Sequence, residues 1–173
     1  RSRMHRFVRT GERVIDVHLR HLPVGQRPEI DRWILSTLHS MVTRYIQAME
    51  GYDVMKAARA ISDFTIDQLS NWYVRRNRRR FWKNEMGPDK LAAYQTLYQC
   101  LETVVRLMAP FAPFLSEEIY RNLNSVTGMA AAESVHLGLM PQSEDSAIDR
   151  DLEVRMEKAQ TVSSLVRAMR NKS

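Results

Sequence analysis

The sequence contains a single cysteine, Cys100, so it can form no internal disulfide, and this usage is typical of a reducing compartment. No run of 18 apolar residues occurs, which excludes a membrane-spanning helix. The first residues carry arginines and lack the apolar stretch of a secretory signal. We therefore expect a cytoplasmic protein that has no membrane among its partners.

Glycine is also scarce. Only six glycines are present and few stretches alternate apolar with polar residues, so little in the sequence is typical of a β-sheet. Apolar residues instead recur at steps of three and four, which predicts amphipathic helices. With 44% hydrophobic residues, the 173-residue chain can bury a core. The predicted fold class is mainly α: a helical bundle of about five helices with at most one short extended segment.

The first two predicted helices have clear ends. One begins after Pro28, with Glu29 and Asp31 in its positively polarised first turn, and stops at Gly51. Asp53 is placed to cap the second. The apolar stripe predicted for the second helix consists of Val54, Ala57, Ala58, Ile61, Phe64, Leu69 and Trp72.

Three further helices are predicted. The third opens at Gly87-Pro88, the fourth is capped by Ser116 after a proline break, and the last begins near Asp149. Ser134–Leu137 is the candidate extended segment. The apolar face expected for the third helix consists of Leu91, Tyr94, Leu97, Tyr98, Leu101, Val104, Val105 and Met108.

The chain divides by this pattern into two parts. Residues 24–173 are predicted to form the helical domain. Residues 1–23 are a poorly assigned leader or interdomain connection, with a hint of one strand between Val8 and Leu19.

Positive charge is concentrated rather than spread. The chain carries 26 basic and 20 acidic residues, a net charge of +6. Residues 72–83 hold six basic residues and no acidic one, and residues 1–22 hold six basic and two acidic ones. The remainder carries a net charge of −4. A mildly acidic body with two basic patches indicates one localised surface for a polyanion.

Residues 72–83 read WYVRRNRRRFWK. On a helix, Arg75, Arg76, Arg79 and Lys83 continue the stripe that is apolar up to Trp72, so the buried face becomes cationic. Two interpretations are open. Either this half of the helix projects beyond the bundle, or its arginines meet acidic partners inside it.

A projecting segment would suit RNA. Arginines form forked bonds to phosphate oxygens, and flat aromatic rings stack on unpaired bases. The alternatives are a solvated basic helix with Trp72 and Trp82 in the core, or an interaction module whose arginines pair with a neighbouring acidic surface. For RNA binding, Trp72 is expected to be the last core residue, and Phe81 and Trp82 are the stacking candidates. The candidate RNA-binding residues are Tyr73, Arg75, Arg76, Arg78, Arg79, Arg80, Phe81, Trp82 and Lys83.

Neither metal ligands nor catalytic residues are predicted. His5, His18 and His21 lie near one another but lack cysteines or carboxylates at ligand spacing. His39 falls on the polar side of its helix and is expected to be solvated. Cys100 is expected to be a buried structural thiol.

A carboxylate pair, Asp63 and Asp67, lies four residues apart on one helix face. Acid–base catalysis is one interpretation, and an ordinary salt bridge such as Arg59 to Asp63 is favoured. The isolated glycines form no phosphate-binding loop. The chain therefore has the character of a binding module.

Four segments follow one another in a recognisable order. In chain order they are PEIDRWILSTL (28–38), DFTIDQLSNWYVRRNRRRFWK (63–83), MAPFAPFLSEEIYRNL (108–123), and SVHLGLMP (134–141) followed by LVRAMRNKS (165–173). Together they resemble the isoleucyl-tRNA synthetases, a family of class I aminoacyl-tRNA synthetases, in the region after the catalytic domain. Related valyl enzymes carry a CDWY type of sequence here, without the arginine run.

The resemblance implies a class Ia anticodon-binding helical domain within a longer enzyme. That enzyme would charge isoleucine onto its tRNA with ATP and Mg, which its catalytic domain would bind. The HIGH and KMSKS signatures and the editing domain are absent from these 173 residues. We therefore expect a non-catalytic module without a cofactor of its own. Its partners would be the tRNA for isoleucine and the catalytic domain of the same polypeptide, and residues 1–22, which do not match, are given no function.

Overall fold

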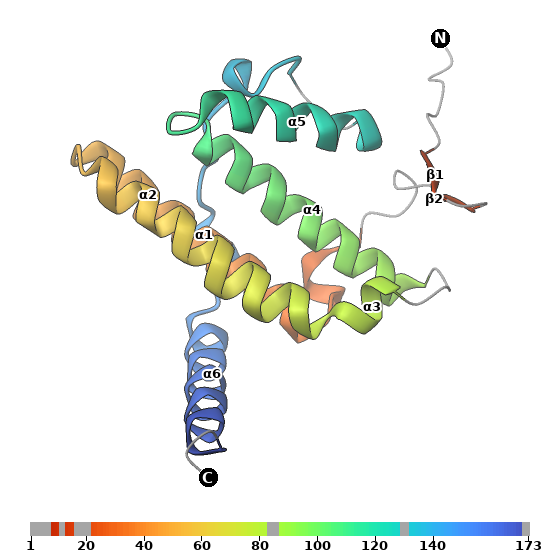
Figure 1. The fold of residues 1–173 in the computed structure, drawn as a ribbon, viewed down its shortest axis with the longest axis vertical. Coiled ribbons are helices and arrows are strands. Elements are labelled where there is room, and N and C mark those ends of the chain that lie inside the picture. The colour runs from red at the N-terminus through yellow and green to blue at the C-terminus, as the bar shows by residue number, and fades with distance from the viewer. Residues whose placement is uncertain (1–7, 11–12, 16–21, 83–86, 129–131, 171–173) are drawn as a thin grey trace.

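The computed structural model describes residues 8–10, 13–15, 22–82, 87–128 and 132–170, and it confirms the mainly helical fold class (Figure 1). A single run of helical segments takes the place of the second predicted helix: α2, the π-helical segment η2 and the short helix α3. The helical elements are α1 (Glu29–Glu50), α2 (Val54–Asp63), η2 (Phe64–Val74), α3 (Arg78–Trp82), α4 (Pro88–Met108), α5 (Pro113–Thr127) and α6 (Arg150–Arg170).

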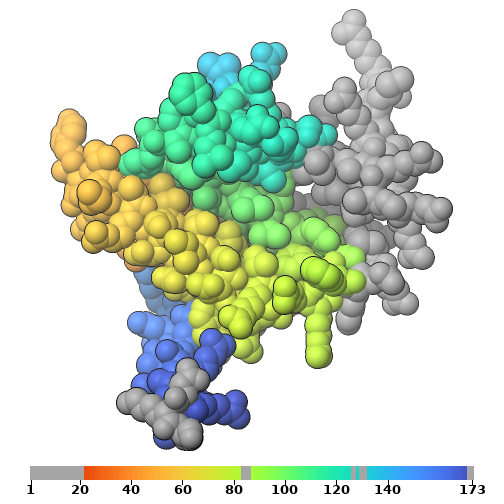
Figure 2. All heavy atoms as spheres, in the orientation of Figure 1, coloured from red at the N-terminus to blue at the C-terminus, as the bar shows by residue number. Residues whose placement is uncertain are grey.

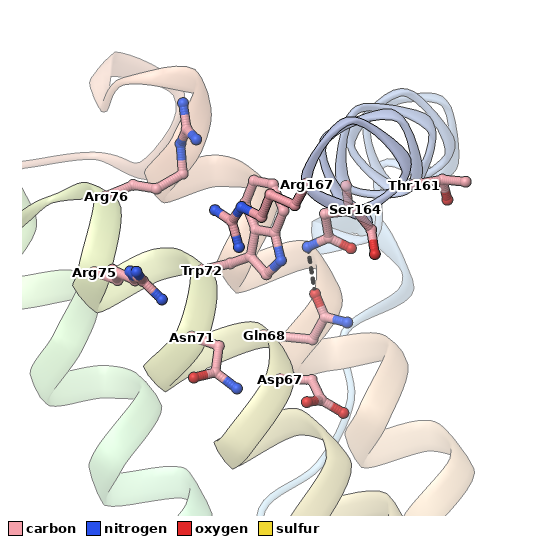
Figure 3. Close-up of a pocket in the computed structure, with 10 residues that line it drawn as sticks. Asp67, Gln68, Asn71, Trp72, Arg75, Arg76, Thr161, Ser164 and Arg167 are labelled. Carbon is pink, nitrogen blue, oxygen red and sulfur yellow. Dashed lines mark hydrogen bonds between the residues drawn. The ribbon is translucent and has the colours of Figure 1, made fainter. Parts of the chain in front are cut away.

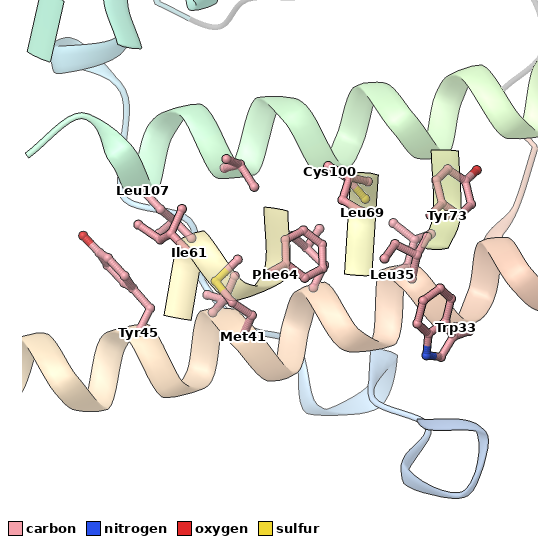
Figure 4. Close-up of a cluster of buried hydrophobic side chains, with 14 of the residues drawn as sticks. Trp33, Leu35, Met41, Tyr45, Ile61, Phe64, Leu69, Tyr73, Cys100 and Leu107 are labelled. Atoms are coloured by element: carbon pink, nitrogen blue, oxygen red, sulfur yellow. The ribbon is translucent and has the colours of Figure 1, made fainter. Parts of the chain in front are cut away.

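The core lies where α1 packs against α2, η2 and α4 (Figure 4). Its fully buried side chains include Ile34, Met41 and Tyr45 from α1 and Phe64 from η2. A second, smaller cluster joins α4 to α5. Burial of apolar area on this scale is the main favourable term for folding such a bundle.

Several predicted helix ends are confirmed. Gly51 follows the last residue of α1, and α4 begins at Pro88 directly after Gly87. The Asp53 side chain accepts a hydrogen bond from the backbone N–H of Lys56 at 2.9 Å, which satisfies a donor that the first turn of α2 leaves unpaired.

Three local predictions are wrong. Ser116 is not the cap of α5, because the helix begins three residues earlier with Pro113 in its first turn; the Ser116 hydroxyl is buried inside it. Ser134–Leu137 is not extended. Val135–Leu137 forms a 3₁₀ turn, η3, which the Ser134 hydroxyl caps by accepting from the His136 N–H. The third correction concerns α4, in which only part of the predicted face is buried.

From Pro88 to Cys100 the buried positions of α4 are small or polar, namely Ala92, Ala93, Thr96 and Cys100; near the end of the helix Leu107, outside the predicted face, is fully buried. The predicted Leu91 and Leu97 are half-buried, with Leu97 packed against the core, and Tyr94 is exposed. Only the Val104 and Val105 part of the predicted face is buried.

The helix α6 leaves the bundle after its first turns (Figures 1 and 2). Leu152 is buried and Met156 packs against the core, but Val162, Val166 and Met169 are exposed. Periodicity thus located the helix correctly and overestimated how much of it the core covers.

Near the N-terminus, two short strands, β1 (Val8–Thr10) and β2 (Arg13–Ile15), pair in antiparallel fashion with Val8 opposite Ile15. The sequence predicted a single strand there. Among the described residues, no helix is long and apolar enough to cross a membrane. The division into residues 1–23 and 24–173 stays a prediction.

Candidate nucleic-acid interface

The π-helical segment decides which residues of the second predicted helix face the core. The backbone N–H of Arg75 donates to the carbonyl of Ser70, five residues earlier, which is the π-helical pattern. Trp72, expected as the last core residue, is therefore only half-buried at the edge of the core. The side chains of this segment that point inward are Phe64, Leu69 and Tyr73.

A buried carboxylate anchors the end of the arginine run. Asp31 of α1 is fully buried, and its two oxygens accept from the Arg80 guanidinium at 2.7 and 2.8 Å. The Tyr73 hydroxyl donates to the same carboxylate at 2.7 Å. A second carboxylate, Asp89 of α4, lies 2.9 Å from Arg80. These bonds hold α3 against α1 and α4.

Burial and charge act together on this cluster. Burial, then the charge of Asp31, raises the pKa of Tyr73 far above its usual range, so the phenol stays neutral. Burial by itself lowers the pKa of Arg80, but the hydrogen bonds and charges of Asp31 and Asp89 outweigh it and raise that pKa. Arg80 is therefore charged, and its two terminal nitrogens are bound to the carboxylates of Asp31 and Asp89.

Two predicted RNA contacts are corrected by this geometry. Tyr73 is 0% exposed, so its ring offers no face to a base. Arg80 binds acidic partners within the bundle. Phe81 is half-buried and meets the rings of Tyr73 and Tyr94 edge to face, at centroid distances of 6.4 and 5.4 Å. Lys83 lies outside the described residues.

The other predicted residues lie on the surface. Arg75, Arg76, Arg78 and Arg79 are exposed, and none of them pairs with a carboxylate among the described residues. Trp82 is 77% exposed, with the Arg78 guanidinium 5.9 Å from its ring centroid. Both interpretations of the arginine run are thus realised: Arg80 turns inward and its neighbours project.

Beside this surface lies an open groove of about 800 Å³, which is bordered by α6 and η2 (Figure 3). Its walls are joined by a hydrogen bond of 2.8 Å from Gln160 of α6 to Gln68 of η2, drawn dashed. The Arg76 guanidinium lies 5.3 Å from the centroid of the Trp72 ring at the groove's edge. The lining residues are Asp67, Gln68, Asn71, Trp72, Arg75, Arg76, Gln160, Thr161, Ser164 and Arg167.

Sequence reasoning missed the α6 side of this groove. Ser164 and Arg167 lie on the polar side of α6, and only tertiary packing brings them opposite Trp72. The basic residues in the last turn of α6 were the available signal. The groove contains three arginines and a single carboxylate, so its lining favours an anion.

Two other residues considered in the sequence analysis, Cys100 and His39, have structural roles. Cys100 is buried, as expected, and burial raises the pKa of its thiol well above the usual range. The expectation that His39 is solvated is wrong: it is half-buried, and its Nδ1 accepts from the Glu144 N–H at 3.1 Å. Burial lowers the pKa of His39 more than Glu144 raises it.

The carboxylate pair lies within the described part of the chain, whereas His5, His18 and His21 lie outside it. Asp67 lines the groove, and Asp63 forms no salt bridge with Arg59 within that part. Among the described residues, no group of three or more histidines, cysteines and carboxylates is arranged to hold a metal ion.

Comparison with known families identifies a match over most of the chain. A family described as the anticodon-binding domain of tRNA ligase matches residues 31–173. This match includes the core helices, the arginine run and both walls of the groove.

Individual relatives extend this result. The isoleucine–tRNA ligase of Bacteroides thetaiotaomicron is 50% identical over 151 residues, which are 87% of this chain and 13% of that protein. The ligase of Cytophaga hutchinsonii is 53% identical over 149 residues, covering 86% of this chain and 13% of that protein. For Thermus thermophilus the identity is 46% over 151 residues, with coverage of 87% and 14%. The chain thus spans about one seventh of the length of these relatives.

Proposed function

Because the chain belongs to the family of tRNA-ligase anticodon-binding domains, we propose that it binds the anticodon stem-loop of the tRNA for isoleucine. It does so as part of a longer cytoplasmic isoleucine–tRNA ligase. The longer protein charges isoleucine onto its tRNA with ATP and Mg, which bind to its catalytic domain. This chain grips and positions the RNA and performs no chemistry itself.

One observation carries the proposal: the cluster of exposed arginines at the end of the second rod, by which we mean the continuous run of α2, η2 and α3. Arg75, Arg76, Arg78 and Arg79 follow one another closely, and none is neutralised by a carboxylate of the described residues. Within the described ranges, folding leaves these four arginines without a carboxylate partner while it pairs Arg80 with Asp31 and Asp89. A surface of this kind attracts a polyanion.

Each part of the surface has a separate task. The arginine guanidiniums bind phosphate oxygens of the stem and loop through forked hydrogen bonds. Trp82, which is exposed, stacks on a base that the loop leaves unpaired. The bonds that Arg80 donates to Asp31 fix the direction in which α3 presents Arg78, Arg79 and Trp82.

Charge reversal tests the proposal. We expect Arg78→Glu with Arg79→Glu to reduce the affinity for an isoleucine anticodon stem-loop at least about tenfold, because about two phosphate contacts are lost and repulsion replaces them. Fluorescence anisotropy at two salt concentrations measures this, with an anticodon-substituted stem-loop for comparison. Affinity should fall as salt rises, since bound phosphates release counterions.

The matched control places the same charge change at the other end of the same rod. Lys56 and Arg59 of α2 are exposed, so Lys56→Glu with Arg59→Glu should bind nearly as well as the parent chain. An affinity that does not depend on salt would contradict the proposal. Unchanged RNA binding by the Arg78 and Arg79 variant would instead favour a role for these arginines in pairing with a neighbouring acidic domain.

A further inference from the structure

The second half of α6 has an apolar side that the described part of the bundle leaves exposed (Figure 1). The first half is tied to the bundle, because Glu153 accepts hydrogen bonds from two serines of α1 and Gln160 donates one to η2. Further along, Val162, Leu165 and Val166 are 60%, 60% and 47% exposed. Since they lie three and four residues apart, they share one side of the helix, which we call the apolar stripe.

The apolar stripe lies on the opposite side of α6 from the groove. The groove residues of this helix are Gln160, Thr161, Ser164 and Arg167. At about 100° of rotation per residue, the stripe points roughly 160° away from the mean direction of these four residues. A ligand in the groove therefore cannot also cover the stripe.

This half of α6 is a poor helix former by itself. Five of the six residues 161–166 are threonine, valine or serine, which lose rotamer freedom in a helix or compete for its backbone hydrogen bonds. A helix shorter than about 12 residues is marginal in water, and most helical stability in proteins comes from packing of an apolar side. The second half of α6 therefore gains its stability when the stripe is buried against a partner.

The charges beside the stripe indicate the chemistry of that partner. Residues 158–170 contain three basic residues and no acidic one. Lys158 lies one turn before the stripe and Arg170 lies one turn after it, and neither pairs with a carboxylate among the described residues. A helix whose apolar positions are flanked by Asp and Glu would neutralise both. A second copy of α6 would instead set cations against cations.

We propose that an amphipathic helix with acidic flanks, from another part of the same longer polypeptide, packs on the apolar stripe of α6. The inference rests on the proposed function only in placing this chain within a longer ligase, and the chain spans about one seventh of its relatives. Three half-exposed side chains offer too little apolar area to offset the cost of joining two separate molecules, whereas a linked helix has a high effective concentration. A helix that lies on a membrane has a broader apolar face with larger residues.

Hydrogen exchange of the chain alone and of the longer polypeptide tests the proposal. In the chain alone, the amides of residues 161–170 should exchange rapidly, because no described element covers the stripe. In the longer polypeptide the same amides should exchange at least about tenfold more slowly. The amides of α1, whose inner side is buried in both, serve as the reference.

Two glutamate variants of the longer polypeptide locate the contact. Leu165→Glu places a charge in the stripe, and Ser164→Glu places the same charge in the same turn on the groove side, as the matched control. Both positions are exposed, so both variants should fold. Leu165→Glu should lose the slow exchange of residues 161–170, and Ser164→Glu should keep it.

A charge reversal tests the acidic flanks. Lys158→Glu with Arg170→Glu should speed the exchange of residues 161–170 in the longer polypeptide at low salt, because like charges then meet across the contact. The effect should shrink at high salt, since exposed charges are screened. Exchange that does not respond to this reversal would overturn the proposal.

The remaining outcomes separate this proposal from its rivals. Equal exchange in the two chains, or slow exchange retained by Leu165→Glu, would overturn it. Protection that depends on protein concentration and accompanies a doubled mass in light scattering would identify a second copy as the occupant instead. Protection of the chain alone by phosphatidylglycerol vesicles would identify a membrane. None of these outcomes changes the affinity for the anticodon stem-loop, which the Arg78 and Arg79 reversal tests separately.

Discussion

Replacing Asp31 by asparagine tests how much the buried carboxylate contributes to stability. The substitution keeps the shape of the side chain but removes its charge. It leaves one acceptor oxygen, whereas Asp31 accepts two bonds from Arg80 and one from Tyr73. The new amide group would direct N–H donors at the Arg80 guanidinium, whose side chain is only 14% exposed.

The expected loss follows from breaking a buried ion pair. Removing one partner of such a pair typically costs 3–5 kcal/mol, and Asp89 still compensates part of the Arg80 charge, so we expect about 3 kcal/mol. In a chain of this size that corresponds to a fall of roughly 6–12 °C in the thermal midpoint. Circular dichroism during urea and thermal unfolding measures both quantities.

Asp89→Asn is the control for this experiment. The Asp89 side chain is 56% exposed, so solvent screens its bond to Arg80 and the loss should stay under about 1 kcal/mol. A loss below about 1 kcal/mol for Asp31→Asn as well would refute the assignment of the Asp31–Arg80 pair as the anchor of α3.

Two further predictions concern titratable groups inside the bundle. The pKa of His39 is lowered in the folded protein, so the unfolded chain takes up the proton first; stability should therefore fall as the pH drops below about 6.5, which is the unfolded value. Thermal midpoints between pH 7.5 and 5, relative to His39→Asn, measure this contribution, and identical profiles would contradict it. Cys100 should not react with a thiol reagent in the folded chain and should react on unfolding, because burial excludes the reagent and raises the pKa of the thiol. Rapid labelling of the folded chain would show that the interior opens more readily than the packing implies.

Much of the fold follows from signals that are local in sequence. Gly51, Asp53 and Pro88 mark helix ends where the structure has them, because capping and backbone restriction act within a few residues. Ser116 fails because Pro113 starts the same helix one turn earlier. Prediction of helix ends from local signals therefore fails where two start signals, such as Pro113 and Ser116, lie within one turn of each other.

The choice of buried face could not be predicted in the same way. A regular period of 3.6 assigns Trp72 to the core, but the π-helical register assigns Tyr73, whose hydroxyl then reaches Asp31 on another helix. In α4, packing against the neighbouring helices buries Ala93 and leaves Leu91 half-buried. Both outcomes depend on partners far away in sequence, and so does the meeting of Arg167 with Trp72.

For the candidate site, too, local sequence signals were informative and contacts between distant residues could not be predicted. Composition located the arginine run correctly, and the exposed Arg78 and Arg79 agree with the interpretation that it projects. It could not single out Arg80, because the sequence spacing between Arg80 and Asp31 gives no sign of their contact. Which exposed residues touch RNA stays a prediction.

Because part of the second rod is π-helical, the number of residues in that part determines which side chains face α1 and α6. Insertions and deletions are ordinarily tolerated in loops and rejected in helices because they rotate all that follows. Deleting one residue between Phe64 and Val74 would turn the remainder of the rod by about 100° relative to α1. Arg80 would leave Asp31, and Trp72 would turn away from α6, with no change in the identity of any retained residue. Residue count in this segment is thus as informative about the groove as residue type.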